Sequence, residues 1–138
     1  MIKVLKNSIT YPKSEAIIIP SNQQGIMNYG ILARVTKDGF RGIEKKAKEY
    51  VRENSIELGD VFSTYPGKLN RRKCKRIYHA VIKKFPNDLL SVDTVRKAIN
   101  NAFKQVIKDK WDSVSICSFG LDTGELDVYI SAFWISKI

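Results

Sequence analysis

Two short loops contain the residue types that can hold a phosphate group. The first spans residues 21–30 and includes Gly25 and Gly30, and the second spans residues 120–127. Glycine adopts positive φ values and lets the backbone come close to a ligand. A helix that begins just after Gly30 also offers free N–H groups and the positive end of its dipole to an anion. Either loop taken alone is a weak signal, because an ordinary turn between a strand and a helix has the same residue types.

The histidine and cysteine content excludes several other kinds of site. His79 is the only histidine, and Cys74 and Cys117 are the only cysteines. This set cannot form a zinc site of the usual spacing, and it does not predict a disulfide framework. Neither cysteine has an arginine six positions later, so the phosphate loop of a thiol phosphatase is also excluded. Because His79 stands inside an apolar run, we expect it to be a hydrogen-bonded core residue.

The composition is that of one globular domain with an excess of positive charge. Of the 138 residues, 43% are hydrophobic and 28% are charged, which argues against intrinsic disorder and a coiled coil. Lysine and arginine number 24 and aspartate and glutamate 14, so the net charge is +10. Such an excess favours contact with polyanions or phosphate-bearing ligands.

No part of the sequence indicates a membrane segment or an export signal. Apolar runs stay far below the ~18–20 residues that cross a bilayer. The first residues lack the apolar stretch and small-residue cleavage site of a signal peptide. We therefore expect a cytoplasmic protein without membrane contact.

Apolar patterning predicts that strands and helices alternate along the chain. Continuous β-branched runs predict buried strands, and apolar residues at positions i, i+3, i+4 and i+7 predict amphipathic helices. Strands are expected at 16–19, 2–5, 56–65, 76–82 and 113–119, and helices at 31–38, 40–52 and 91–107. The alternation indicates a three-layer α/β/α domain whose loops at the carboxyl ends of the strands can receive a ligand.

Particular residues mark the ends of these elements. Pro20 is expected to stop the strand at 16–19, and Gly39 to end the helix at 31–38 in the C′ position. Ser91 is the expected N-cap of the last helix, which has Ile107 at the end of its apolar stripe. The tail at residues 128–138 does not distinguish a helix from a strand.

The order of five short segments resembles the macro domain family, whose members bind ADP-ribose and its derivatives. Residues 6–10 (KNSIT) stand where the family has its Gly-Asp-Ile-Thr turn, and residues 15–22 (EAIIIPSN) where it has Asp-Ala-Ile-Val-Asn-Ala-Ala-Asn. Residues 58–61 (LGDV) are similar to the segment before the family's third strand, and residues 77–81 (IYHAV) to its Val-Ile-His-Ala-Val strand. Residues 120–124 fall at the second phosphate loop. The resemblance covers most of the chain.

The resemblance implies a fold and a binding site. It implies one macro-like domain over residues 1–138 with a mixed central sheet and a shortened C-terminus. It also implies that Asn22 lies by the distal ribose and that backbone amides of both loops hold the diphosphate, without a metal or a cofactor. The implied ligand-binding residues are Ser8, Ile9, Asn22, Gly25, Asn28, Tyr29, Gly30, Ile31, Gly120, Leu121, Thr123 and Gly124.

The sequence departs from the family pattern at three places. Ser8 replaces the aspartate that usually recognises the adenine amino group, and Ile19 replaces the first asparagine of the paired-asparagine motif. Of the glycine run in the first loop, only Gly25 and Gly30 are present.

A catalytic role follows from one branch of the family, similar to the terminal ADP-ribose protein glycohydrolase. That branch uses a lysine after the His-Ala-Val-like strand and an aspartate in the second loop. The resemblance implies Lys83 or Lys84 as the lysine, which attacks the ribose C1″ as an amine, and Asp122 or Asp127 as the proton-transferring carboxylate. It is compatible with hydrolysis of ADP-ribose 1″-phosphate and with removal of ADP-ribose from proteins. The alternative interpretation is that the two adjacent lysines are surface residues.

The region between the strands predicted at 56–65 and 76–82 is strongly basic. Its cations are Lys68, Arg71, Arg72, Lys73, Lys75 and Arg76. This density can neutralise several phosphates, so the segment is interpreted either as a solvated connection or as a surface for nucleic acid or poly(ADP-ribose). The second interpretation includes a degenerate macro-like fold that has lost nucleotide binding and acts as a nucleic-acid or protein-interaction module.

Overall fold

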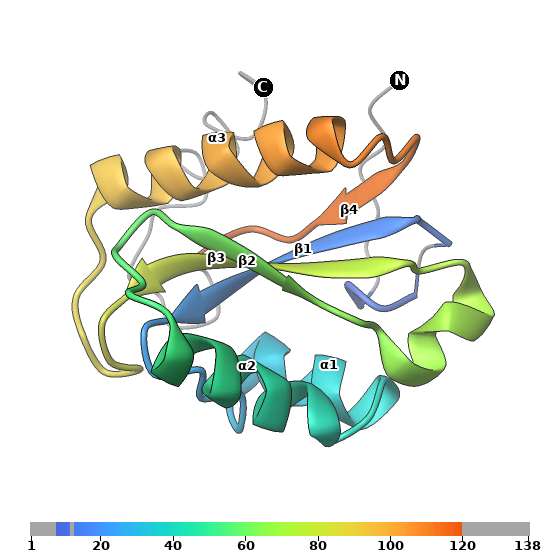
Figure 1. Ribbon diagram of the computed structural model, residues 1–138, viewed down its shortest axis with the longest axis horizontal. Helices are drawn as coiled ribbons and strands as arrows, with labels where there is room; N and C mark the ends of the chain where they lie inside the picture. The colour runs from blue at the N-terminus through green and yellow to red at the C-terminus, as the bar shows by residue number, and fades with distance from the viewer. Residues whose placement is uncertain (1–7, 12, 120–138) are drawn as a thin grey trace.

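The protein is built as three layers around one mixed β-sheet (Figure 1). The computed structural model describes residues 8–11 and 13–119 of the chain. Helices α1 (Gly30–Asp38) and α2 (Gly42–Glu53) cover one face of the sheet, and the long helix α3 (Val92–Lys108) covers the other. The α/β/α fold predicted from the sequence is confirmed.

The sheet has four strands in the order β2-β3-β1-β4. These strands are β1 (Ala16–Asn22), β2 (Val61–Thr64), β3 (Arg76–Lys83) and β4 (Val114–Ile116). β1 runs parallel to both β3 and β4, whereas β2 runs antiparallel to β3. β2 and β3 therefore form an antiparallel pair, and the connection between them includes a 3₁₀ helix, η1 (Gly67–Arg72).

The β-branched run of β1 faces two separate cores. Ile17 and Ile19 pack in a cluster with residues of α1 and α2, whereas Ile18 packs in a cluster with residues of α3. All three side chains are almost completely buried. A strand covered on both faces needs apolar residues at every position, which explains why the sequence shows a continuous run instead of alternation.

β1 continues past Pro20, so the prediction that this proline ends the strand is wrong. β1 and β3 stay paired with Pro20 opposite Ala80, whereas β4 pairs with β1 only as far as Ile18. A proline removes one donor from a ladder. The loss is tolerated because β1 has no β4 partner at the level of Pro20.

Several other predicted boundaries move by a few residues. α1 begins at Gly30 and α2 at Gly42. β2 and β4 are shorter than predicted. The strand predicted at 2–5, the loop at 120–127 and the tail at 128–138 lie outside the described residues. Within the described part of the chain, no helix combines the length and the hydropathy needed to cross a bilayer.

The helix ends agree only partly with the expected capping residues. Ser91 is the N-cap of α3, as predicted, and its hydroxyl accepts a hydrogen bond from the Thr94 N–H at 3.5 Å. Gly39 follows α1 but has a φ of −88°, so it is not the left-handed stop that the sequence predicts. A Cβ atom at Gly39 would lie 2.9 Å from the Pro66 carbonyl oxygen, so close packing explains this glycine. The sequence also predicts Ile107 in the buried stripe of α3, but this side chain is 71% exposed.

Candidate functional site

Three parallel strands end at one edge of the sheet. Because β1, β3 and β4 run in the same direction, their carboxyl ends and the loops that follow them gather at this edge. Asn22, the last residue of β1, pairs with Lys83, the last residue of β3. The Gln23 N–H donates to the Lys83 carbonyl oxygen at 2.9 Å, which extends the contact into the first loop. This edge is where the fold offers loops to a ligand.

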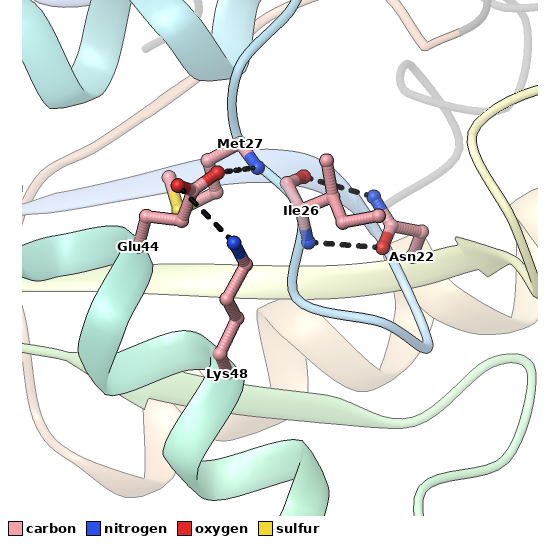
Figure 2. A network of polar contacts seen from close by, with 5 residues as sticks. All are labelled: Asn22, Ile26, Met27, Glu44 and Lys48. Carbon is pink, nitrogen blue, oxygen red and sulfur yellow. Dashed lines mark hydrogen bonds and ion pairs between the residues drawn. The ribbon is translucent and has the colours of Figure 1, made fainter.

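Asn22 shapes the first loop from inside. Its side chain is fully buried, and its Oδ1 accepts hydrogen bonds from the N–H groups of Gln24 and Ile26 at 3.0 and 3.2 Å. Its Nδ2 donates to the Ile26 carbonyl oxygen at 3.0 Å and to the Tyr29 hydroxyl oxygen at 3.1 Å. Figure 2 shows the two contacts with Ile26. These bonds engage both ends of the amide, so the Asn22 side chain holds the shape of the loop.

Glu44 holds the other side of the loop (Figure 2). It lies in the first turn of α2, and its Oε2 accepts a hydrogen bond from the Met27 N–H at 2.5 Å. Its Oε1 lies 3.4 Å from Nζ of Lys48, one turn further along the helix. One carboxylate therefore ties the loop to α2 while its charge is balanced by a lysine.

Gly25 brings the loop into direct contact with the backbone of α2. Its φ is +69°, a conformation that favours glycine. A Cβ atom at this position would lie 2.9 Å from the Ala47 carbonyl carbon and 2.9 Å from the Lys48 nitrogen. Both the backbone conformation and the close packing therefore require glycine here.

The start of α1 supplies free hydrogen-bond donors. Tyr29 is the N-cap, with no capping hydrogen bond from its side chain and no acidic residue in the first turn. The first bond of the helix runs from the Ala33 N–H to the Tyr29 carbonyl oxygen at 3.1 Å. The amides of residues 30–32 precede this bond, so the positive end of the helix remains available to an anion.

The structure brings together most of the site residues predicted in the first loop. Asn28 and Gly30 are exposed, and Tyr29 and Ile31 are half-buried against the core under α1 and α2. Gly25 is buried, and its N–H donates to the Asn22 carbonyl oxygen at 3.3 Å. The donors that remain for a ligand therefore belong to the later part of the loop and to the start of α1.

Ser8 and Ile9 lie elsewhere. The Ser8 hydroxyl is 3.1 Å from the Thr10 hydroxyl, which donates to Oδ2 of Asp38 at the last residue of α1. Ile9 is buried in the core cluster under α1 and α2. The structure thus places Ser8 beside the end of α1 opposite Gly30, and its hydroxyl is engaged there.

The second loop falls outside the described residues. Its predicted site residues are Gly120, Leu121, Asp122, Thr123, Gly124 and Asp127. In the part of the chain that the structure describes, no group of three histidine, cysteine, aspartate or glutamate side chains could hold a metal ion.

Lys83 and Lys84 differ sharply in environment. Lys83 is only 5% exposed, and its Nζ donates to the Pro86 carbonyl oxygen at 3.3 Å. Lys84 is exposed. The interpretation of both lysines as surface residues is therefore wrong for Lys83. Of the two candidates, Lys83 is the one built into the edge of the sheet beside Asn22.

His79 is a core residue, as its sequence context predicts. It is completely buried, its Nε2 lies 2.8 Å from the Thr64 hydroxyl, and its ring stacks on Phe62 with centroids 4.4 Å apart. Desolvation by burial lowers the pKa of His79 from 6.5 to about 3. The ring is therefore neutral at physiological pH, and no described contact connects it to the loop.

Glu44 is the residue of the site that sequence reasoning missed. In the sequence, Glu44 is only an acidic residue at the start of a lysine-rich helix. Acidic residues at such positions are common on solvated helix faces, so the pattern does not mark Glu44 as part of a site. Replacing it by alanine leaves the Met27 N–H without its acceptor. We expect Glu44→Ala to lower the free energy of unfolding by about 1–3 kcal/mol and to accelerate exchange of the Met27 amide hydrogen by about tenfold or more.

Denaturation in urea and hydrogen exchange measure these two effects. Glu49→Ala is the matched control, because Glu49 lies on the same helix and, within the described part of the chain, pairs only with Lys46, at 3.5 Å. We expect the control to change stability by less than about 0.5 kcal/mol. Equal effects of the two substitutions would show that Glu44 does not anchor the loop.

Comparison with known proteins places this architecture in a family. The family model of the macro domain matches residues 18–134. A protein of Aquifex aeolicus is 31% identical over 131 residues, which cover 95% of this chain and 76% of that protein. The solved macrodomain of Mycobacterium tuberculosis DarG superimposes with a TM-score of 0.88 at 17% identity, covering 99% of this chain and 88% of that one. Thermosipho africanus DarTG, solved in complex with ADP-ribose, has a TM-score of 0.80 at 13% identity, covering 94% and 36% of the two chains. The chain therefore belongs to the macro domain family, as its sequence motifs indicate.

Proposed function

We propose that the protein binds ADP-ribose, or a phosphorylated or protein-linked derivative, at the carboxyl edge of β1 and β3. The observation that carries this proposal is the convergence of the loop held by Asn22, the free amides at the start of α1 and the buried Lys83. The complex of Thermosipho africanus DarTG with ADP-ribose, which shares the fold, supports the choice of ligand.

The geometry supports an assignment of the groups that contact the diphosphate. The amides of Gly25, Ile26 and Met27 already donate to Asn22 and Glu44. Residues 28–32 are therefore the ligand-binding part of the first loop, with the helix dipole of α1 and the positive charge of Lys83 adding to the attraction. Binding by backbone amides of this kind needs no metal ion.

A hydrolytic activity extends the same proposal. The Lys83 amine attacks C1″ of the distal ribose, and the new C1″–N bond forms while the bond from C1″ to the leaving oxygen breaks. The carboxyl group of Asp122 or Asp127 gives its proton to the leaving oxygen and then takes a proton from water. The water oxygen bonds to C1″ while the C1″–N bond breaks and its electron pair returns to nitrogen, which releases ADP-ribose and regenerates the Lys83 amine. The leaving group is a protein side chain or the 1″-phosphate. Nζ of Lys83 gives up its contact with the Pro86 carbonyl to reach C1″.

Calorimetry with ADP-ribose, ADP and AMP tests binding. We expect ADP-ribose to bind most tightly and with modest salt dependence, because few charged side chains contribute. Gly30→Val should weaken binding by about tenfold or more, because Gly30 has a φ of +52° at the mouth of the loop and valine strains this backbone.

Ala33→Val is the matched control on the same helix, at the first residue whose amide is already bonded within the helix. It should leave the affinity within about twofold. If the unmodified protein binds none of the three nucleotides, the degenerate interaction module replaces this proposal. If the two variants lose affinity equally, the start of α1 is not the diphosphate site.

A further inference from the structure

The basic segment at residues 68–76 lies at the opposite end of the sheet from the proposed nucleotide site. It connects the end of β2 to the start of β3, whereas Lys83 ends β3 about 23 Å further along the strand. Figure 1 shows η1 and the ends of β1 and β3 on opposite sides of the molecule. A ligand of this segment therefore lies on a different surface from the proposed nucleotide site.

The backbone of the segment is held in one conformation. Leu69 and Cys74 are each 2% exposed and anchor it in the core. Lys73 has a φ of 75° and closes η1 with its N–H directed to the carbonyl oxygens of Leu69 and Asn70. The N–H of Lys75 donates to the Glu15 carbonyl oxygen at 2.7 Å. The cations thus project from a folded platform and not from a flexible hairpin tip.

The positive charge of this platform is not neutralised locally. No acidic residue occurs between Asp60 and Asp88 in the sequence. Among the residues that the structure describes, no ion pair includes a cation of the segment. Two carboxylates from packed neighbours have other partners, since Asp38 accepts from the Thr10 hydroxyl and Glu15 accepts from the Asp112 N–H. Lys68, Arg71, Lys73 and Lys75 are exposed and available to a polyanion.

Three exposed aromatic residues come from stretches of chain that contact or adjoin this segment. Tyr65 is 71% exposed and lies 4.5 Å below the guanidinium of Arg76. Phe40 is 40% exposed and its ring packs on the backbone of Gly67. Tyr11, 62% exposed, follows Thr10, whose carbonyl oxygen accepts a hydrogen bond from Arg72 at 3.1 Å.

From this combination we infer that the surface formed by the segment and these three rings binds single-stranded nucleic acid. Cations that follow a phosphate backbone, together with aromatic rings on which bases stack, are the recurrent means by which proteins bind single strands. A duplex keeps its bases stacked inside and leaves the rings unused. The pairing of Arg76 with Tyr65 adds a preformed stacking unit.

Fluorescence anisotropy with a labelled 20-nucleotide single strand tests the inference, with the matching duplex, poly(ADP-ribose) and anionic lipid vesicles as competitors. We expect log K to fall with log salt, with a slope of about 0.7 for each phosphate neutralised. Replacing Lys68, Arg71, Lys73 and Lys75 with glutamine should reduce this slope by about 0.7 for each phosphate that is no longer neutralised. Tyr65→Ala should weaken binding by about fivefold or more.

A second quadruple variant provides the charge-matched control. Lys45, Lys46, Lys104 and Lys108 are exposed on α2 and α3, and their replacement with glutamine removes the same net charge elsewhere. The control should keep the affinity and the slope, and both quadruple variants should bind ADP-ribose as the unmodified protein does. Equal losses in the two variants, tighter binding of the duplex, of poly(ADP-ribose) or of vesicles, or no effect of Tyr65→Ala would each overturn the inference. Because ADP-ribose binding is measured separately, its failure is distinguishable from failure at this surface.

Discussion

Lys83→Met is expected to abolish release of ADP-ribose while leaving its binding nearly intact. Methionine keeps the length of the buried stem but removes the amine that attacks C1″. Loss of a nucleophile typically costs orders of magnitude, so we expect the rate to fall by roughly a hundredfold or more. Because the diphosphate is bound mainly by backbone amides, the dissociation constant of ADP-ribose should change by less than about tenfold.

Lys84→Met is the matched control, because Lys84 is adjacent in sequence but exposed. The rate is measured as ADP-ribose released from an ADP-ribosylated protein and from ADP-ribose 1″-phosphate. The control should stay within about twofold of the unmodified protein. A Lys83→Met variant that folds, binds ADP-ribose and keeps its rate would exclude the amine mechanism. An unmodified protein that binds ADP-ribose but releases it from neither substrate would exclude hydrolysis of both and leave binding as the function.

Local patterns in the sequence predict the elements of this fold well. The spacing of Ile43 and Ala47 predicts α2, and the N-cap Ser91 predicts the start of α3, because both depend on residues within one helical turn. The order of the family motifs then predicts that the central sheet is mixed. The sequence is less informative about where a strand ends when pairing with neighbouring strands determines that end, as for β1 at Pro20.

The internal supports of the site are less predictable because they depend on distant contacts. Glu44 and Met27 are 17 residues apart, and Gln23, whose side-chain amide donates to the Ile56 carbonyl oxygen, is 33 residues from Ile56. Lys83 has the same residue type as Lys84 and differs only in burial, which follows from the pairing of β3 with β1. Sequence patterns therefore locate the loop, and the three-dimensional packing identifies the side chains that hold it.

The buried His79 should make the stability of the protein strongly dependent on pH. Its pKa is about 6.5 when unfolded and is lowered to about 3 in the fold, so between these values the unfolded chain binds one more proton than the folded one. Stability from the neutral ring is fully present above pH 6.5 and is lost as the pH falls toward 3. The expected loss is about 1.4 kcal/mol for each pH unit, which is large beside the ~5–15 kcal/mol of a typical domain.

Urea unfolding between pH 7.5 and pH 4.5, compared with a double variant, isolates this effect. In Thr64→Val with His79→Phe the stacked ring on Phe62 is kept, and both partners of the 2.8 Å hydrogen bond are removed together, so no polar group of this pair is left unpaired. Aspartate and glutamate residues titrate in both proteins and cancel in the difference. The unmodified protein should lose roughly 2.7 kcal/mol more than the variant between pH 7.5 and 4.5, because almost all of this loss falls in the two pH units below the unfolded pKa, at about 1.4 kcal/mol per unit. Parallel stability curves would instead mean that His79 takes up its proton equally in the folded and unfolded chains, in which case the ring is accessible to water in the native state.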